Sequence, residues 1–154
     1  MKGLFDWIIC ITIGFMAVLV VGSGCSKENP LQKEGVWKKV CTTWGEKETD
    51  VATRMQTYKR LDRTSTSLCY SGKGDAVAIS YKFVQDSLCA AMVMVDASSV
   101  NLDDIKDSFK SCEYLGENNS MDLYIDYIDN SLVTISECQK NDKRFYAVSY
   151  IALD

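Results

Sequence analysis

The chain has 154 residues, a formal net charge of −4 and no histidine. Acidic and basic residues are mixed along its length, and no basic patch is interleaved with aromatic residues, which disfavours nucleic acid as a partner. The lack of histidine excludes Ser-His-Asp and Cys-His catalysis and removes the commonest metal ligand.

Residues 1–24 are typical of a bacterial lipoprotein signal peptide. Lys2 opens a short basic region, and the apolar run from Ile8 to Val21 is short for a bilayer-spanning helix but suits a signal peptide. The run ends in Ser23-Gly24-Cys25, which resembles the lipobox of bacterial lipoproteins, whose cysteine becomes the lipidated first residue of the mature chain. Gly22 and Asp6 depart from the usual pattern, so an uncleaved membrane anchor is the alternative.

We expect acyl chains of the palmitate type on Cys25 to attach the chain to a membrane, because two or three chains acting together give stable attachment. Residues 25–36 are mostly polar and contain the only proline of the chain, Pro30. This composition is typical of a short tether. The run Cys25 to Glu28 resembles lipoproteins of the Bacteroidetes, which implies a cell-envelope protein of the outer membrane. Exposure on the periplasmic side and on the cell surface both stay open.

The sequence predicts a single domain over residues 37–154, with two halves, 37–97 and 98–154. In the first half an acidic run follows Trp44, and Val51, Met55 and Tyr58 form one apolar stripe on a helix of about 12–15 residues. Trp44 is placed to pack against the first turn of that helix as a hydrophobic staple.

Strands follow this predicted helix. Apolar and polar residues alternate over residues 68–71, and a Gly-rich turn follows. The same alternation from Val77 to Phe83 is typical of a half-buried strand. The next strand, Leu88 to Val95, is apolar on both sides, which predicts that both of its faces are covered.

The second half repeats this plan. Asn101 is a good N-cap for a helix that carries Ile105 and Phe109 four residues apart, as Val51 and Met55 are. Strands are expected over 123–127, 132–136 and 145–153, with turns at Asp129-Asn130 and at residues 141–143. We therefore predict an α+β fold of tandem α-β-β-β repeats, with helices packed on one face of an antiparallel sheet.

A tyrosine strip is the predicted binding site. We expect Phe83 to pair with Leu88 across the turn between their strands, and Leu88 to correspond to Phe145 in the second half of the repeat. With that register, the side chains of Tyr146, Val148 and Tyr150 point outward, beside Tyr124. Tyrosine offers area and a polar handle, so such a strip favours recognition of a partner. A register one residue off, which would place these tyrosines in the core, is the alternative, and so is cover by the tether or by a second molecule.

The remaining chemistry is sparse. Five cysteines follow Cys25, so at most two disulfides form within the chain, and packing as small apolar residues is the alternative for most of them. No Cys-x-x-Cys pair supports zinc, and no EF-hand loop supports calcium at Asp122 and Asp126. We expect no metal, no cofactor and no enzyme activity, with a carboxylate-pair hydrolase left open.

Three resemblances bear on function. The pattern Trp44-Gly45-x5-Val51-x3-Met55, with Tyr81-x-Phe83 and Leu88 later, resembles a group of small Bacteroidetes lipoproteins. The same helix entry loosely resembles the small outer-membrane lipoprotein A family, which helps to assemble outer-membrane β-barrels, although Gly45 and Val51 match its pattern only loosely. Tandem α-β units also resemble the β-lactamase-inhibitor-protein fold, in which a sheet face grips a partner.

These observations predict a lipid-anchored, non-catalytic module that binds a protein or ligand. An accessory lipoprotein of an outer-membrane assembly complex and an inhibitor of a secreted enzyme are the alternatives. The expected contacts are the membrane, through the lipid on Cys25, and one further partner whose identity the sequence leaves open.

Overall fold

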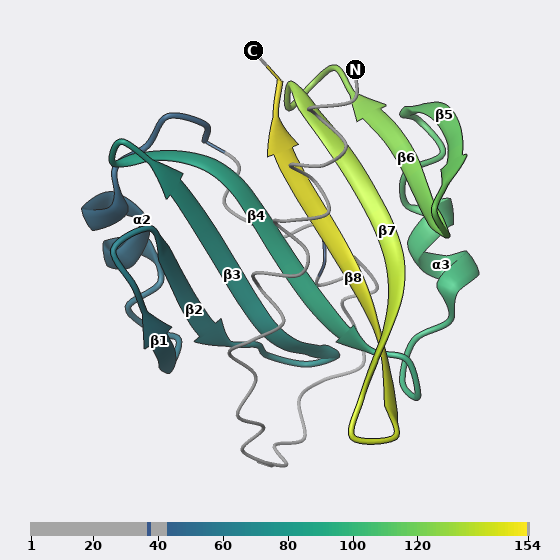
Figure 1. Ribbon diagram of the computed structural model, residues 1–154, viewed down its shortest axis with the longest axis horizontal. Coiled ribbons are helices and arrows are strands. Elements are labelled where there is room, and N and C mark those ends of the chain that lie inside the picture. The colour runs from purple at the N-terminus through teal and green to yellow at the C-terminus, as the bar shows by residue number, and fades with distance from the viewer. Residues whose placement is uncertain (1–36, 38–42, 154) are drawn as a thin grey trace.

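The computed structural model describes Trp37 and residues 43–153, which form one eight-stranded antiparallel sheet with two short helices (Figure 1). The strand order from edge to edge is β1-β2-β3-β4-β8-β7-β6-β5. The last strands of the two halves, β4 and β8, therefore pair with each other in the middle of the sheet. The predicted signal peptide, the tether and Cys25 lie outside the described residues.

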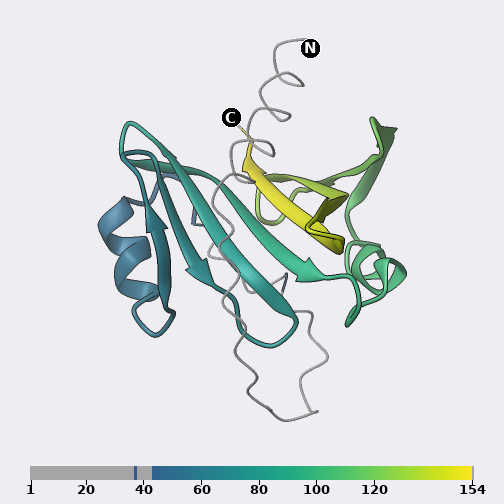
Figure 2. The same ribbon diagram turned by 60° about the horizontal axis from the view of Figure 1, so that its bottom comes forward.

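Within the described residues, each half contributes one α-helix followed by four strands. The first half contains α2 (Glu48–Arg54), β1 (Arg60–Arg63), β2 (Ser67–Ser71), β3 (Ala76–Val84) and β4 (Ser87–Asp96). The second half contains α3 (Leu102–Asp107), β5 (Glu113–Asn118), β6 (Met121–Asp126), β7 (Ser131–Lys140) and β8 (Lys143–Ala152). Figure 2 shows α2 and α3 at opposite ends of the sheet.

The predicted fold class is wrong, because the structure is dominated by its sheet. The helices have only seven and six residues, and each half has four strands where three were expected. The additional strands, β1 and β5, are the two edge strands, and most of their side chains are exposed or half-buried. An edge strand with little buried surface lacks the apolar alternation from which strands are recognised, so the sequence pattern predicts neither β1 nor β5.

Local sequence explains where the helices begin and end. In α3 the side chain of Asn101 accepts a hydrogen bond from the backbone N–H of Asp103, so the predicted N-cap is confirmed. In α2 only Val51 is buried, and the chain leaves the helix at Met55 and turns toward β1. Neither of these described helices is long and apolar enough to cross a bilayer.

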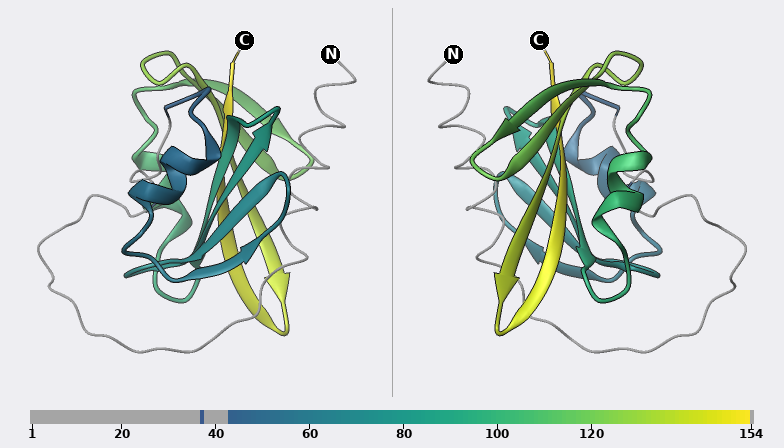
Figure 3. Two further views of the ribbon diagram at one scale, coloured as in Figure 1. Left: turned by 90° about the vertical axis from the view of Figure 1, so that its left-hand side faces the viewer. Right: turned by 90° about the vertical axis from the view of Figure 1, so that its right-hand side faces the viewer.

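The main hydrophobic core lies between the sheet and the helices. Figure 3 shows both helices on the same side of the sheet, which we call the helix face. Val51, Ile105 and Phe109 bring the helical segments into this core, where they meet aromatic and β-branched side chains from the strands. The largest strand side chains in it are Tyr70, Tyr81, Phe83, Tyr124, Tyr146 and Tyr150.

Two tryptophans connect the first half of the chain to the second. The indole N–H of Trp37 donates to Oγ of Ser108 at 2.7 Å. The indole N–H of Trp44 donates to the carbonyl of Asp129 and to Oγ of Ser131, at the β6–β7 turn. The hydrogen bonds of Trp44 thus reach the other half of the domain, whereas packing against its own helix was predicted.

Candidate functional site

The four residues of the predicted tyrosine strip are buried. Tyr124, Tyr146, Val148 and Tyr150 each expose 7 % of their surface or less and belong to the core of the helix face. Phe109 packs against the rings of Tyr124 and Tyr150, with centroids 5.9 and 6.2 Å away. Burial raises the pKa of Tyr150. The outward orientation predicted for this strip is therefore wrong, and the alternative register, one residue off, is the one that the structure has.

A β-bulge accounts for this reversal. Phe83 does pair with Leu88, as predicted, but the preceding residue Lys82 pairs with Ala90, so Cys89 is an extra residue in β4. One extra residue inverts the alternation of side chains beyond it. From this point Ala91, Val93 and Val95 enter the core of the helix face, and their partners on β8 are Tyr150, Val148 and Tyr146.

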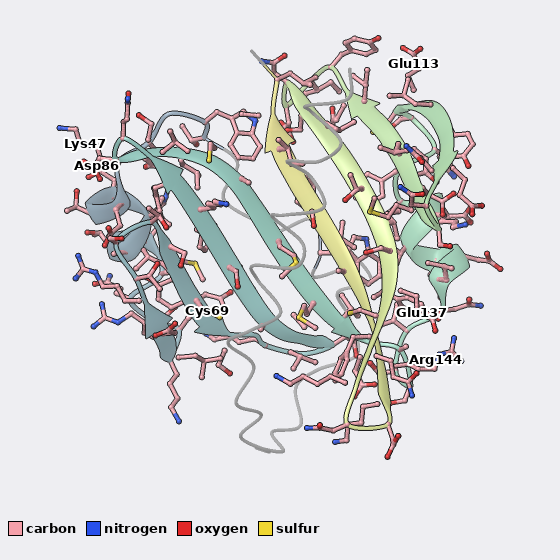
Figure 4. The ribbon with its side chains drawn as sticks, in the orientation of Figure 1. Lys47, Cys69, Asp86, Glu113, Glu137 and Arg144 are labelled. Carbon is pink, nitrogen blue, oxygen red and sulfur yellow. The ribbon has the colours of Figure 1, made fainter. Side chains whose placement is uncertain are left out.

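A different pair of tyrosines is exposed, at one corner of the sheet. Tyr127 and Ile128 expose 71 % and 92 % of their surface in the β6–β7 turn. The hydroxyl of Tyr127 donates to the carboxylate of Glu113 at the start of β5, next to Tyr114 and Leu115, which are 53 % and 49 % exposed. We call these four apolar residues, Tyr114, Leu115, Tyr127 and Ile128, the β5 corner. Figure 4 shows Glu113 near the top of the picture, and Glu137 and Arg144 lower down on the same side of the sheet.

The sequence carried a signal for the β5 corner. Tyr114-Leu115 and Tyr127-Ile128 are both pairs of consecutive apolar residues next to acidic or turn-forming residues. Two apolar neighbours on a strand point to opposite faces, so on an edge strand or in a turn at least one of them has no core to enter. The alternation of Leu123, Ile125 and Tyr127 predicts a strand that includes Tyr127, but β6 ends at Asp126.

Polar contacts hold the β5 corner in place and give it an acidic character. The hydroxyl of Tyr114 donates to Asp122 at 2.9 Å, and its ring packs on Tyr124 with centroids 5.1 Å apart. Lys106 forms a 2.6 Å ion pair with the same carboxylate of Asp122. The hydrogen bond to Asp122 raises the pKa of Tyr114, and the hydrogen bond to Glu113 raises the pKa of Tyr127.

The opposite side of the sheet, which we call the helix-free face, carries neither of the described helices (Figure 3). Its side chains are mostly apolar and form rows that run across the paired strands. The central row contains Ser80, Met92, Ser149, Thr134 and Leu123. The row on one side contains Lys82, Ala90, Ile151, Leu132 and Ile125, and the row on the other contains Ala78, Met94, Ala147, Ser136 and Met121.

Two hydroxyl groups near the middle of this face have no hydrogen-bond partner. They belong to Thr134 and Ser149, which are paired across β7 and β8 and expose 0 % and 3 % of their surface. Ala147 and Ser136 form the next pair of the same two strands, so four small residues adjoin. We call these four residues the small-residue square. Long side chains border it on both sides, Met92 and Met94 on β4 and Leu123 and Met121 on β6.

Other reactive groups are few. No three His, Cys, Asp or Glu side chains of the described part of the chain lie together in a way that could hold a metal ion. No disulfide joins any two of the described cysteines, and burial raises the pKa of the Cys69, Cys89 and Cys138 thiols. An open concavity of about 460 Å³ lies between the β4–α3 loop and the β7–β8 turn, lined by Asp96, Ala97, Ser98, Asp142, Lys143 and Arg144.

Comparisons with models of protein families, with curated proteins and with solved structures gave no match for this chain. The resemblances to lipoprotein families therefore stay predictions.

Proposed function

We propose that the chain is a lipid-anchored protein of the cell envelope that acts as a non-catalytic binding module and captures a protein partner at the β5 corner. The observation that carries the proposal is the concentration of large exposed apolar side chains at this corner. Of the five large hydrophobic residues that are exposed in the described part of the chain, only Val84 lies elsewhere. Exposed apolar residues that gather in one place, bordered by polar residues, mark interaction sites.

The chemistry of the corner indicates the kind of partner. Tyr114 and Tyr127 combine a large ring with a hydroxyl that is already hydrogen-bonded to an acid, so both side chains are held in place before binding. Glu113 precedes Tyr114 in the chain and binds the hydroxyl of Tyr127, and Asp126 and Asp129 flank Tyr127 and Ile128 in the turn. A protein surface with an apolar centre and basic residues at its rim would complement this arrangement.

The anchoring part of the proposal rests on the sequence. The apolar run Ile8 to Val21 ends in Ser23-Gly24-Cys25, and lipidation of Cys25 would place the domain at the membrane of the envelope. A Cys25→Ser variant should lose labelling by a fatty-acid analogue and accumulate as an unprocessed precursor. Labelling that persists in this variant would overturn the anchoring.

Partner capture tests the corner. A photoreactive amino acid at position 128 of the full-length chain, followed by irradiation of intact cells, should give one main crosslinked protein. The Tyr127→Ser/Ile128→Ser variant, with the photoreactive group moved to position 115, should lower the yield about 30-fold, since residues central to an interface contribute about 2 kcal/mol or more. Its melting temperature should stay within about 2 °C of wild type, because substitutions at exposed sites change stability little.

Val84→Ser is the matched control, because Val84 is also a large exposed apolar residue but lies at the β3–β4 turn. This control should keep wild-type capture. Equal capture by the wild type and the double variant, or equal loss in the control, would place the partner site elsewhere. The identity of the captured protein separates a barrel-assembly complex from a secreted enzyme.

A further inference from the structure

The two outermost strands of the sheet, β1 and β5, are built in the same way. One residue of β1, Leu61, is left out of the pairing with β2, and one residue of β5, Leu115, is left out of the pairing with β6. These two leucines are as far apart in the sequence as Val51 and Ile105, the buried residues of the two helices. The same spacing therefore matches each residue at the β1 end of the sheet with one residue at the β5 end.

The matched residues differ in charge. The correspondences are Lys59 with Glu113, Arg60 with Tyr114, Leu61 with Leu115, Arg63 with Glu117, and Lys73 with Tyr127. The four basic residues of this set and their four counterparts are all exposed. One end of the sheet is thus basic where the other is acidic and aromatic. We call Lys59, Arg60, Leu61 and Lys73 the β1 corner.

The β1 corner combines apolar surface with positive charges that are available to a partner. Leu61 is half-buried, and so is Tyr58, whose ring centroid lies 4.5 Å from Nζ of Lys73. Among the described residues, neither Lys59 nor Arg60 has an ion-pair partner. An apolar centre with basic residues at its rim is the surface that complements the β5 corner.

We propose that the partner of the β5 corner is the β1 corner of a second copy of this chain. The inference rests on the proposed function, because it names the partner of the same site. In this contact Tyr127 and Ile128 of one copy pack against Leu61 and the alkyl stems of the basic side chains of the next copy. Charges of opposite sign lie around this apolar centre.

Charge favours a head-to-tail contact over a symmetric one. Two β5 corners that faced each other would bring the carboxylates of Glu113 and Glu117 of both copies together. Two β1 corners would do the same with the positive charges of Lys59 and Arg60. Like charges that face each other across an interface disfavour it, so only the pairing of unlike corners is complementary.

The order of the strands suits this contact. Neighbouring strands are antiparallel across all eight positions, and Figure 1 shows β1 and β5 at opposite ends of the sheet. The β1 strand of a second copy would therefore continue the antiparallel order beside β5, with the helices of both copies on the same side. Both edge strands are short and carry a bulge, so side chains rather than a long backbone ladder would hold the copies together.

A head-to-tail contact leaves one corner of each kind unused in a pair of copies, so further copies can add to it. The contact is small, and small interfaces are weak in dilute solution. Attachment of every copy to one membrane would raise the local concentration of the corners and favour assembly there.

Crosslinking of the purified chain tests the inference. The full-length chain, with a photoreactive amino acid at position 128, is reconstituted in phosphatidylcholine vesicles and irradiated. A product with twice the mass of the chain is expected, and peptide mass spectrometry should place the crosslink on residues 58–63 or 71–75 of the second copy. The Arg60→Glu/Lys73→Glu variant puts like charges opposite the acidic corner and should lower the yield at least about tenfold at low salt.

Mixing two forms of the chain shows which corners meet. The Arg60→Glu/Lys73→Glu variant that carries the photoreactive group keeps its own β5 corner, so an excess of unlabelled wild-type chain should restore the crosslink. This recovery also shows that the variant is folded. Lys47→Glu/Lys143→Glu is the matched control, because it reverses two exposed positive charges outside the β1 corner and should keep the wild-type yield.

The outcomes separate this inference from the proposed function. The inference is overturned if no product of twice the mass forms, if the Arg60→Glu/Lys73→Glu variant keeps the wild-type yield, if wild-type chain does not restore the crosslink, or if the control loses as much. A different protein crosslinked to position 128 in intact cells, with no dimer in vesicles, would support the proposed function and reject only the second copy as its partner. No crosslink in cells or in vesicles would reject both.

Discussion

Removing the hydroxyl of Tyr150 should destabilise the domain, although the substitution keeps the ring. This hydroxyl donates to the carbonyl of Trp37, and both groups are buried. A Tyr150→Phe variant removes this hydrogen bond from a buried carbonyl. A buried polar group that loses a hydrogen bond costs about 1–3 kcal/mol, and because Tyr150 is almost fully buried no screening by water reduces this value.

The size of the expected effect follows from the size of the domain. In a domain of this length 1 kcal/mol corresponds to about 4 °C in melting temperature, so Tyr150→Phe should melt about 4–12 °C below wild type. Circular dichroism of the purified full-length chain measures this shift, and urea unfolding gives the free energy directly. Tyr127→Phe is the matched control, because its hydroxyl donates to Glu113 at an exposed site and should contribute little. If Tyr150→Phe melted like wild type, or if the control lost as much, the contact between Trp37 and β8 would not hold the fold together.

Three further predictions test the core, a turn and the thiols. Met55→Asp should abolish the cooperative melt, because burying an unpaired carboxylate costs several kcal/mol out of the roughly 5–15 that stabilise a domain; a melt near the wild-type temperature would place Met55 at the surface. Gly72→Ala should lower the urea midpoint by an amount equivalent to about 1–3 kcal/mol, because the added Cβ would lie 2.2 Å from the carbonyl oxygen of Ala76; an unchanged midpoint would contradict that geometry. Cys89 and Cys138 should react slowly with iodoacetamide at pH 7.5 and rapidly in denaturant, because burial raises the pKa of both thiols and lowers the thiolate fraction; fast reaction of the native chain would show that they are open to solvent.

Turns and caps were the features that the sequence predicted best. The expected turn around Asn141 and Asp142 joins β7 to β8, and both residues have a positive φ, +49° and +62°. Asn and Asp tolerate that conformation better than other residues with a side chain. The N-cap at Asn101 was found for the same reason, since its side chain satisfies a helix N–H that has no partner within the helix. Signals of this kind depend on a few neighbouring residues, so they survive without knowledge of the tertiary structure.

Edge strands and the bulge could not be predicted in this way. The β1 segment, Arg-Leu-Asp-Arg, contains one apolar residue, and its pairing with β2 depends on a neighbour that the local sequence does not reveal. The bulge at Cys89 inserts one residue into a run that is apolar on both sides, so no change of pattern marks it. Because the repeat matches Leu88 with Phe145, the same shift of one residue reverses the predicted faces of Tyr146 and Tyr150 in β8.

The size of the side chains on the two faces offers a better criterion for the register. Helices of seven and six residues cannot cover an eight-stranded sheet, so the side chains of the strands must fill the space between them. Tyrosine suits this role, because its ring fills volume and its hydroxyl reaches a polar atom beyond the ring. Tyr81 donates to Sδ of Met55, and Tyr150 donates to the carbonyl of Trp37, so each hydroxyl meets a partner on the helix side. A face rich in tyrosine is therefore the one that packs against the short helices. The opposite face keeps small buried residues, Ala147 and Ser149 among them, so its strands need no tyrosine to fill space.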